Sequence, residues 1–158
     1  TVELKDISTM ERFYRWIAGL QMAKDKLAVG YGPGNFHNFY KSYTVSSFRT
    51  YVSDNPEKSG IHSYFLLMLV EQGIPGMLIF IALSFYTLIS GERIYHQSKD
   101  LIRKSIVMGV LLSFVVINAF LLINDMIETD KMGSFFFIGI AVLINADLAN
   151  KRELNLKN

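Results

Sequence analysis

The chain contains three long runs of apolar residues that carry no charge. Residues 72–91 and 105–124 each extend for about 20 residues without Asp, Glu, Lys or Arg, and residues 132–146 form a shorter third run. A helix needs about 20 predominantly apolar residues to cross the hydrocarbon core of a bilayer. The second run is apolar on all sides, which suits lipid better than a water-facing helical bundle. We therefore expect three transmembrane helices, at about 74–91, 105–124 and 132–149.

The charges between these runs predict how the helices cross the membrane. The connection 92–104 and the C-terminal tail 151–158 are rich in Lys and Arg, whereas the connection 125–131 is mainly acidic. Cytoplasmic loops of membrane proteins carry an excess of Lys and Arg. We therefore place the basic connection and the tail in the cytoplasm, and residues 1–72 on the opposite side of the membrane.

The extracytoplasmic region opens with a predicted helix at about 9–24. Ser8 and Glu11 have the spacing of a capping box, in which two side chains satisfy free backbone donors at a helix start. At the helical period, Arg12 and Arg15 lie opposite an apolar stripe. The Gly/Pro turn "VGYGPGNF" then ends the helical region. The Tyr- and Phe-rich segment after it either stacks on sugar rings or packs this region at the membrane interface.

A break interrupts the sequence before the first transmembrane helix. The stretch "HSYFLLMLVEQGIPG" begins at His62 and ends in Pro-Gly. Because Pro lacks an N–H and disfavours a helix interior, we predict a short interfacial helix at about 62–72 and a separate span after it. Irregular backbone at membrane depth survives only beside protein or a wet cavity, so the break indicates a cavity. Glu71 fits two roles equally, binding the interrupted backbone or orienting a base.

The sequence contains no pattern typical of a metal site, a reactive thiol or a phosphate-binding loop. The three His residues lie far apart, Cys is absent, and "GYGPGN" lacks the Lys and Ser/Thr of a phosphate-binding loop. The remaining candidates are the cations Arg12, Arg15 and Arg49, together with His62. Arg binds phosphate oxygens in pairs, and His exchanges protons near neutral pH. These residues also have ordinary roles, in headgroup pairing or at a helix start. The three runs contain no ionisable residue, which argues against a transporter.

These motifs, in this order, resemble the O-antigen ligase family. Over residues 8–80, "ERFYRWIAGLQMAKDKLAVGYGPGNF" and "IHSYFLLMLVEQGIPGMLIF" match an Arg four residues before a Trp, a Gly-rich turn, and a block that runs from a His to Pro-Gly. "SDNPE" and "NDMIETDKMGS" are similar to a Bacteroidetes-type branch. The resemblance implies the C-terminal part of an all-α, multi-pass protein of GT-C-like architecture. It also implies the bacterial inner membrane, with the active face in the periplasm.

The resemblance further implies a reaction and its partners. The implied reaction is transfer of a glycan from undecaprenyl diphosphate to lipid A–core. An O-antigen polymerase and a protein O-oligosaccharyltransferase are alternatives within the family, and a non-catalytic membrane subunit or transporter fragment is the alternative from another class. The implied partners are the undecaprenyl-diphosphate-linked glycan donor, lipid A–core or another glycan or protein acceptor, and membrane lipids. No cofactor, metal or nucleic acid is implied.

The family's functional residues fall on particular positions of this sequence. Arg12, four residues before Trp16, resembles the downstream member of an arginine pair that holds the diphosphate. His62 resembles the histidine that deprotonates or positions the acceptor hydroxyl. The resemblance also implies that Gly32, Pro33 and Gly34 shape the loop. From their chemistry, Arg15 and Arg49 are further candidates for binding substrate, and Ser63 and Glu71 are candidates for supporting the site. Ser63 stands where the family has Asn, so a helper hydrogen bond can differ. The upstream arginine has no counterpart, so the chain alone is expected to be inactive.

Overall fold

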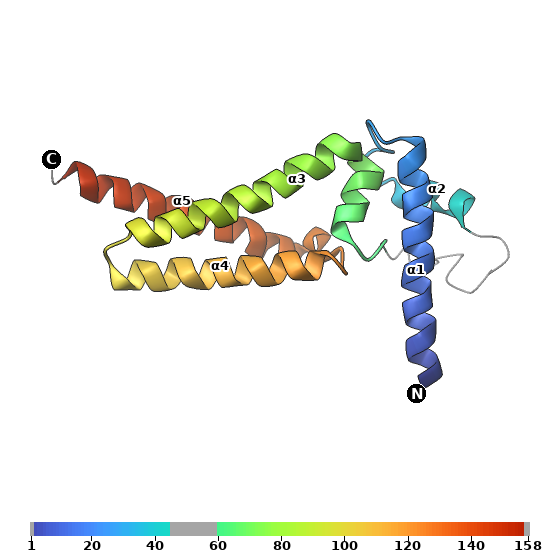
Figure 1. The fold of residues 1–158 in the computed structure, drawn as a ribbon, viewed down its shortest axis with the longest axis horizontal. Coiled ribbons are helices and arrows are strands. Elements are labelled where there is room, and N and C mark those ends of the chain that lie inside the picture. Colours follow the sequence, from blue (N-terminus) through green and yellow to red (C-terminus); the bar gives the residue numbers. More distant parts are fainter. Residues whose placement is uncertain (1, 45–59, 157–158) are drawn as a thin grey trace. The chain divides into compact units, whose positions relative to one another are not determined.

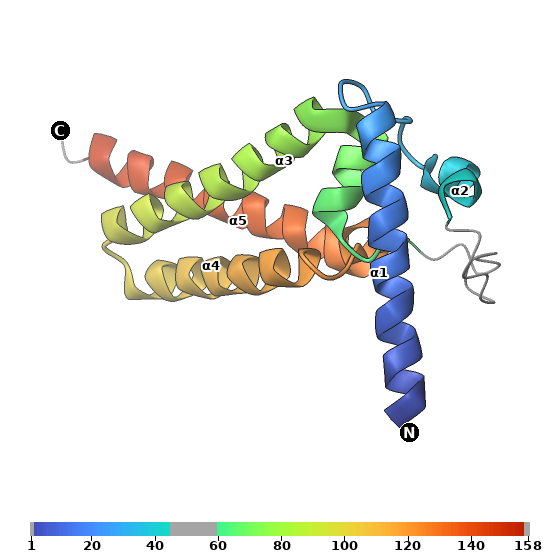
Figure 2. The same ribbon diagram turned by 45° about the vertical axis from the view of Figure 1, so that its right-hand side comes forward.

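The computed structural model describes residues 2–44 and 60–156 of the 158-residue chain (Figures 1 and 2). These residues form helices and turns, with no strand among them. In chain order the helices are α1 (Val2–Asp25), α2 (Phe36–Tyr40), the 3₁₀ helix η1 (Lys41–Tyr43), α3 (Tyr64–Gln97), α4 (Leu101–Leu121), the 3₁₀ helix η3 (Met126–Glu128) and α5 (Asp130–Asn155). They fall into two compact units. Unit 1 comprises Thr1–Phe80 and Leu121–Asp125, and unit 2 comprises Ile81–Phe120 and Met126–Asn158.

Three helices are long and apolar enough to cross a membrane. They are Tyr64–Gln97, Leu101–Leu121 and Lys131–Asn155. Large apolar side chains are exposed on all three, such as Ile79, Leu112 and Ile144. Such faces suit lipid, because a helix in water normally carries a polar face. The fold is that of an all-α membrane protein, which confirms the predicted fold class.

Helix α1 begins earlier than the sequence predicts. It covers Val2–Asp25, so Ser8 lies inside the helix and the predicted capping box at its start is wrong. One face of α1 is buried in the core of unit 1 through Ala18, Met22 and Ala23. These side chains are small or flexible, which allows the chain segments of unit 1 to approach α1 closely.

Helix α3 is interrupted at Gly73, between the predicted segments 62–72 and 74–91. Gly73 has φ 70° and ψ −169°, a conformation found almost only in glycine. The helix bends sharply at this point (Figure 1). The ring centroids of Tyr64 and Phe80 lie 4.8 Å apart, whereas a straight helix would separate these residues by roughly 24 Å. Pro75 lies in the first turn of the second half, where its missing N–H disturbs no helical hydrogen bond.

The Gly-rich turn after α1 is bound to this break in α3. Three backbone hydrogen bonds join the two segments, with the N–H groups of Tyr31, Gly32 and Ile74 donating to the carbonyls of Val70, Glu71 and Leu27 at 3.0, 2.8 and 2.8 Å. The backbones cross so closely that a Cβ on Gly30 would collide with the backbone of Glu71. A Cβ on Gly73 would likewise collide with the carbonyl of Leu27. Two glycines therefore permit the crossing.

Unit 2 combines an apolar interior with one buried polar network. Asn150 is 4% exposed, and its Nδ2 donates to the Ile94 carbonyl at 3.3 Å and to Ser98 Oγ at 2.9 Å. Its Oδ1 accepts a hydrogen bond from Arg103 at 2.7 Å, and Arg103 also pairs with Glu153 at 2.7 Å. This network ties α3, α4 and α5 together by interhelical hydrogen bonds, as polar side chains do between membrane helices.

Candidate functional site

Unit 1 brings two of the predicted site residues into direct contact. Arg15 on α1 is 6% exposed, and His62 lies just before α3. Nη1 of Arg15 donates to Nε2 of His62 at 2.9 Å and to the carbonyl of Gly60 at 3.1 Å. The site is therefore built from the buried face of α1 and from the segment that leads into α3.

This contact determines which nitrogen of His62 carries the proton. A guanidinium group has only N–H donors, so Nε2 accepts with its lone pair. The neutral ring then carries its proton on Nδ1. Nδ1 is buried. The backbone of His62 has φ 56°, which is uncommon for a residue other than glycine and is often found at functional sites.

The surroundings of His62 favour its neutral form. Burial lowers the pKa of His62 from its ordinary value of 6.5. The negative charge of Asp125 raises this pKa, the positive charges of Arg15 and Arg12 lower it, and a side-chain hydrogen bond to Asn124 raises it. Because the pKa is lowered overall from 6.5, the neutral form of the ring predominates at pH 7. A neutral imidazole is the form that a general base requires.

Two residues that no sequence pattern indicated, Asn124 and Asp125, complete this side of the site. Asn124 and Asp125 belong to unit 1, although they follow α4. The carbonyl of Asn124 accepts the Tyr64 N–H at 3.2 Å, which holds the start of α3. The Asp125 carboxylate packs against Gly60, where a Cβ would collide with it. In the sequence this connection is notable only for its acidic charge, because no local pattern links it to the distant His62.

Tyr40 is a further buried neighbour of Arg15. Its side chain is 3% exposed within the core formed by α1 and α2. Burial raises the pKa of Tyr40, whereas the charge of Arg15 and a hydrogen bond to it lower this pKa. The Arg15 guanidinium therefore lies between a phenol, a carbonyl and the His62 ring. Its Nε atom is buried and has no hydrogen-bond partner among the described residues.

The carboxylate of Glu71 binds the backbone of the Gly-rich turn, and not the interrupted backbone of α3. Its side chain is 4% exposed, and its two carboxylate oxygens accept the N–H groups of Gly34 at 2.8 Å and Phe36 at 3.0 Å. The Gly-rich turn thus occupies both oxygens, and within the described parts of the chain no hydrogen bond joins Glu71 to His62. Gly32 and Gly34 have φ 91° and 72°, so the turn uses conformations that favour glycine.

The remaining predicted residues differ in their placement. Arg12 is exposed on α1, one turn before Arg15, and its charge acts on His62. Ser63 is buried beside His62, and its carbonyl accepts the Leu67 N–H in the first turn of α3 at 2.9 Å. Pro33 lies between the two positive-φ glycines of the turn. Arg49 lies outside the described residues. Within residues 2–44 and 60–156, no group of His, Asp and Glu is arranged to hold a metal ion.

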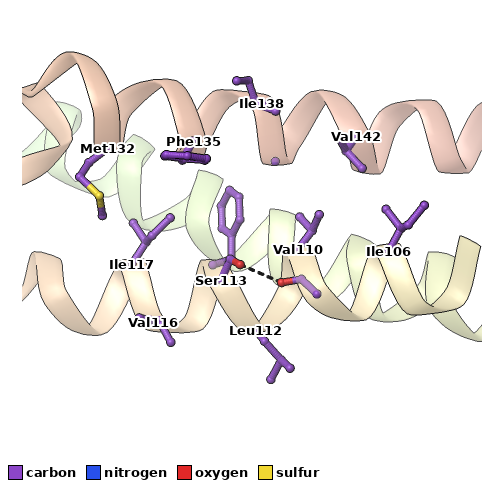
Figure 3. A pocket seen from close by; sticks show the side chains of 13 residues that line it. Ile106, Val110, Leu112, Ser113, Val116, Ile117, Met132, Phe135, Ile138 and Val142 are labelled. Atoms are coloured by element: carbon purple, nitrogen blue, oxygen red, sulfur yellow. Dashed lines mark hydrogen bonds between the residues drawn. The ribbon is translucent and has the colours of Figure 1, made fainter.

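Unit 2 contains a groove of a different chemical character. It lies between α4 and α5, has a volume of about 620 Å³ and is lined mainly by branched aliphatic and aromatic side chains (Figure 3). The hydroxyl of Ser113, on its wall, donates within α4 to the Gly109 carbonyl at 2.8 Å. None of the residues that line the groove is titratable. The groove therefore suits hydrocarbon and offers no group for transfer chemistry.

The fold and this site define a class of protein: a helical membrane protein in which a buried Arg contacts a half-buried His at the start of a broken membrane helix. A family model described as O-antigen ligase matches residues 1–81, half of the chain, and these residues include both members of the pair. The chain therefore belongs to the O-antigen ligase family, whose members are membrane glycosyltransferases. Comparisons with curated proteins and with solved structures found no match.

Proposed function

We propose that the protein transfers a glycan from undecaprenyl diphosphate to lipid A–core at the periplasmic face of the bacterial inner membrane. The observation that supports this most directly is the contact between Arg15 and His62, with Arg12 one helical turn away. All three residues lie within the part of the chain that the family model matches. Transfer from a diphosphate requires a base and positive charge near the leaving group, and a neutral imidazole beside two cations supplies both.

In the proposed reaction, the acceptor hydroxyl attacks the anomeric carbon of the donor sugar. The new C–O bond forms while the bond between this carbon and the phosphate oxygen breaks, and the electron pair leaves with undecaprenyl diphosphate. His62 takes the proton of the acceptor hydroxyl. A positioned base of this kind contributes about 10²–10⁴-fold to a rate. Arg12 stabilises the charge that grows on the leaving diphosphate, because a fixed cation lowers the energy of such a transition state.

Glycan ladders from a strain that lacks the native gene test this proposal. In the complete protein, His62→Ala and Arg12→Ala are each expected to abolish glycan attachment while the amount of protein in the membrane is unchanged. His96→Ala and Arg93→Ala are matched controls, because both side chains are exposed and lie in unit 2. Normal attachment by His62→Ala would exclude His62 as the base.

The same ladders distinguish the related activities. A ligase is indicated if the deletion leaves lipid A–core bare while long polymer remains on the lipid carrier. Single-unit products on lipid A–core indicate an O-antigen polymerase instead. A normal lipid A–core ladder combined with unglycosylated target proteins indicates a protein O-oligosaccharyltransferase. A deletion that leaves all glycans unchanged indicates a non-catalytic membrane subunit.

A further inference from the structure

The proposed base is covered in the structure. A general base takes a proton with the lone pair of an unprotonated nitrogen. In neutral His62 this nitrogen is Nε2, and its lone pair already accepts a hydrogen bond from Arg15 at 2.9 Å. The other ring nitrogen carries the proton and is buried. An acceptor hydroxyl therefore cannot give its proton to His62 until Arg15 leaves Nε2.

Arg15 is bound in a way that a phosphate can displace. Its Nη1 donates to two uncharged acceptors, the His62 ring and the Gly60 carbonyl. Its Nε is buried without a partner in the described residues. A hydrogen bond from guanidinium to phosphate joins two charged groups and forms in pairs, whereas the present acceptors of Arg15 carry no charge. A diphosphate in this site is thus a better partner for Arg15 than the imidazole is.

We propose that Arg15 covers His62 in the free protein and that the diphosphate of the donor draws the guanidinium away, which uncovers the base. The inference rests on the proposed function and adds an order of events to it. The donor binds first, and only then is an acceptor hydroxyl activated. Without donor, neither water nor an acceptor meets a free base. In the free protein Arg15 is a positioning residue, and its exposed neighbour Arg12 meets the diphosphate first.

Acylation of histidine by diethyl pyrocarbonate tests this order, because the reagent attacks an imidazole nitrogen with a free lone pair. The rate at His62 is measured by mass spectrometry on the complete protein in detergent, with His96 as the exposed reference. We expect slow acylation in wild type, and acceleration of about tenfold or more by inorganic pyrophosphate, in line with the loss of one hydrogen bond from a charged donor. Arg15→Ala is expected to react fast with or without pyrophosphate. In Arg12→Ala without pyrophosphate, the acylation of His62 is expected to stay slow, since Arg12 does not cover the ring.

A second measurement is made on the wild-type protein, and a variant serves only to assign its signals. Nitrogen-15 spectra of histidine-labelled protein report which ring nitrogen carries the proton, and His62→Gln assigns the signals. We expect a proton on Nδ1 and a hydrogen-bonded Nε2 in free protein, and loss of that bond when pyrophosphate is added. A proton on Nε2 in the free protein would overturn the proposal.

Other outcomes are equally decisive. Equal acylation rates in wild type and Arg15→Ala would show that Arg15 does not cover the base. Slower acylation on adding pyrophosphate would show that the anion covers His62 instead of freeing it. If pyrophosphate accelerates the acylation of His62 but undecaprenyl diphosphate does not, the site binds a free anion. This result would exclude a lipid-linked diphosphate as the group that displaces Arg15. Failure of the proposed function appears separately, as glycan attachment that persists in His62→Ala while the acylation pattern holds.

Discussion

The crossing between the Gly-rich turn and the break in α3 supports a quantitative comparison of two glycines. Gly30 and Gly34 have nearly the same φ, 66° and 72°. An added Cβ on Gly34 meets nothing within 4 Å, whereas one on Gly30 collides with the backbone of Glu71. Changing each to Ala therefore introduces similar backbone strain, and only Gly30→Ala also forces the two segments apart.

The expected magnitudes follow from these contacts. A left-handed conformation in a residue other than glycine costs about 1–2 kcal/mol, so Gly34→Ala should lower the free energy of unfolding by about this amount. Gly30→Ala should also break the hydrogen bonds from Tyr31 and Gly32 to the first half of α3, each of which contributes about 0.5–1.5 kcal/mol. The total loss for Gly30→Ala is then about 2–5 kcal/mol.

Denaturant unfolding in detergent measures this difference. Trp16 is the single Trp of the chain and packs against the core of unit 1, so its fluorescence follows the unit that contains the crossing. The free energy of unfolding should fall in the order wild type, Gly34→Ala, Gly30→Ala. If Gly30→Ala is as stable as Gly34→Ala, the close approach of the two backbones is refuted.

Two further predictions use the same unfolding measurement. Glu71→Gln keeps one acceptor but turns an NH₂ donor toward one of the two loop N–H groups, so the free energy of unfolding should fall by about 1–3 kcal/mol, while the exposed Glu92→Gln should change nothing. An unchanged Glu71→Gln would contradict the carboxylate contacts. Because the folded pKa of His62 lies below 6.5, the unfolded state binds more protons there. The contribution of His62 to the free energy of unfolding should therefore be fully present above pH 6.5 and decrease as the pH falls toward the folded pKa. His62→Gln should remove this contribution to the pH dependence of the free energy of unfolding. A slope equal in wild type and variant would contradict the lowered pKa.

The membrane architecture could be predicted because its signals are local. A charge-free run that is long enough to cross a bilayer is visible in the sequence without knowledge of its neighbours. The break in α3 was also predictable, since "GIPG" concentrates residues that disfavour a continuous helix. The contact that accompanies the break was not, because it depends on the approach of Leu27 from another segment.

The details of the site were less predictable for the same reason. Arg12 and Arg15 lie one turn apart on the same helix, and the sequence alone favoured Arg12 as the functional cation. Which of the two is buried depends on where the segment at Gly60 and His62 crosses α1, which is a tertiary property. Asp125 could not have been found by any local pattern, because it reaches the site only through the return of the chain after α4.

Unit 1 is formed by two separate segments of the chain, which limits how this protein can be recombined with others of its family. The chain leaves unit 1 after Phe80, returns for Leu121–Asp125 and leaves again. A fragment cut after residue 81 would keep the family match yet lose the carbonyl that holds the Tyr64 N–H and the carboxylate beside Gly60. A functional exchange of membrane helices would therefore have to replace 81–120 and 126–158 as two separate modules and retain the five residues between them.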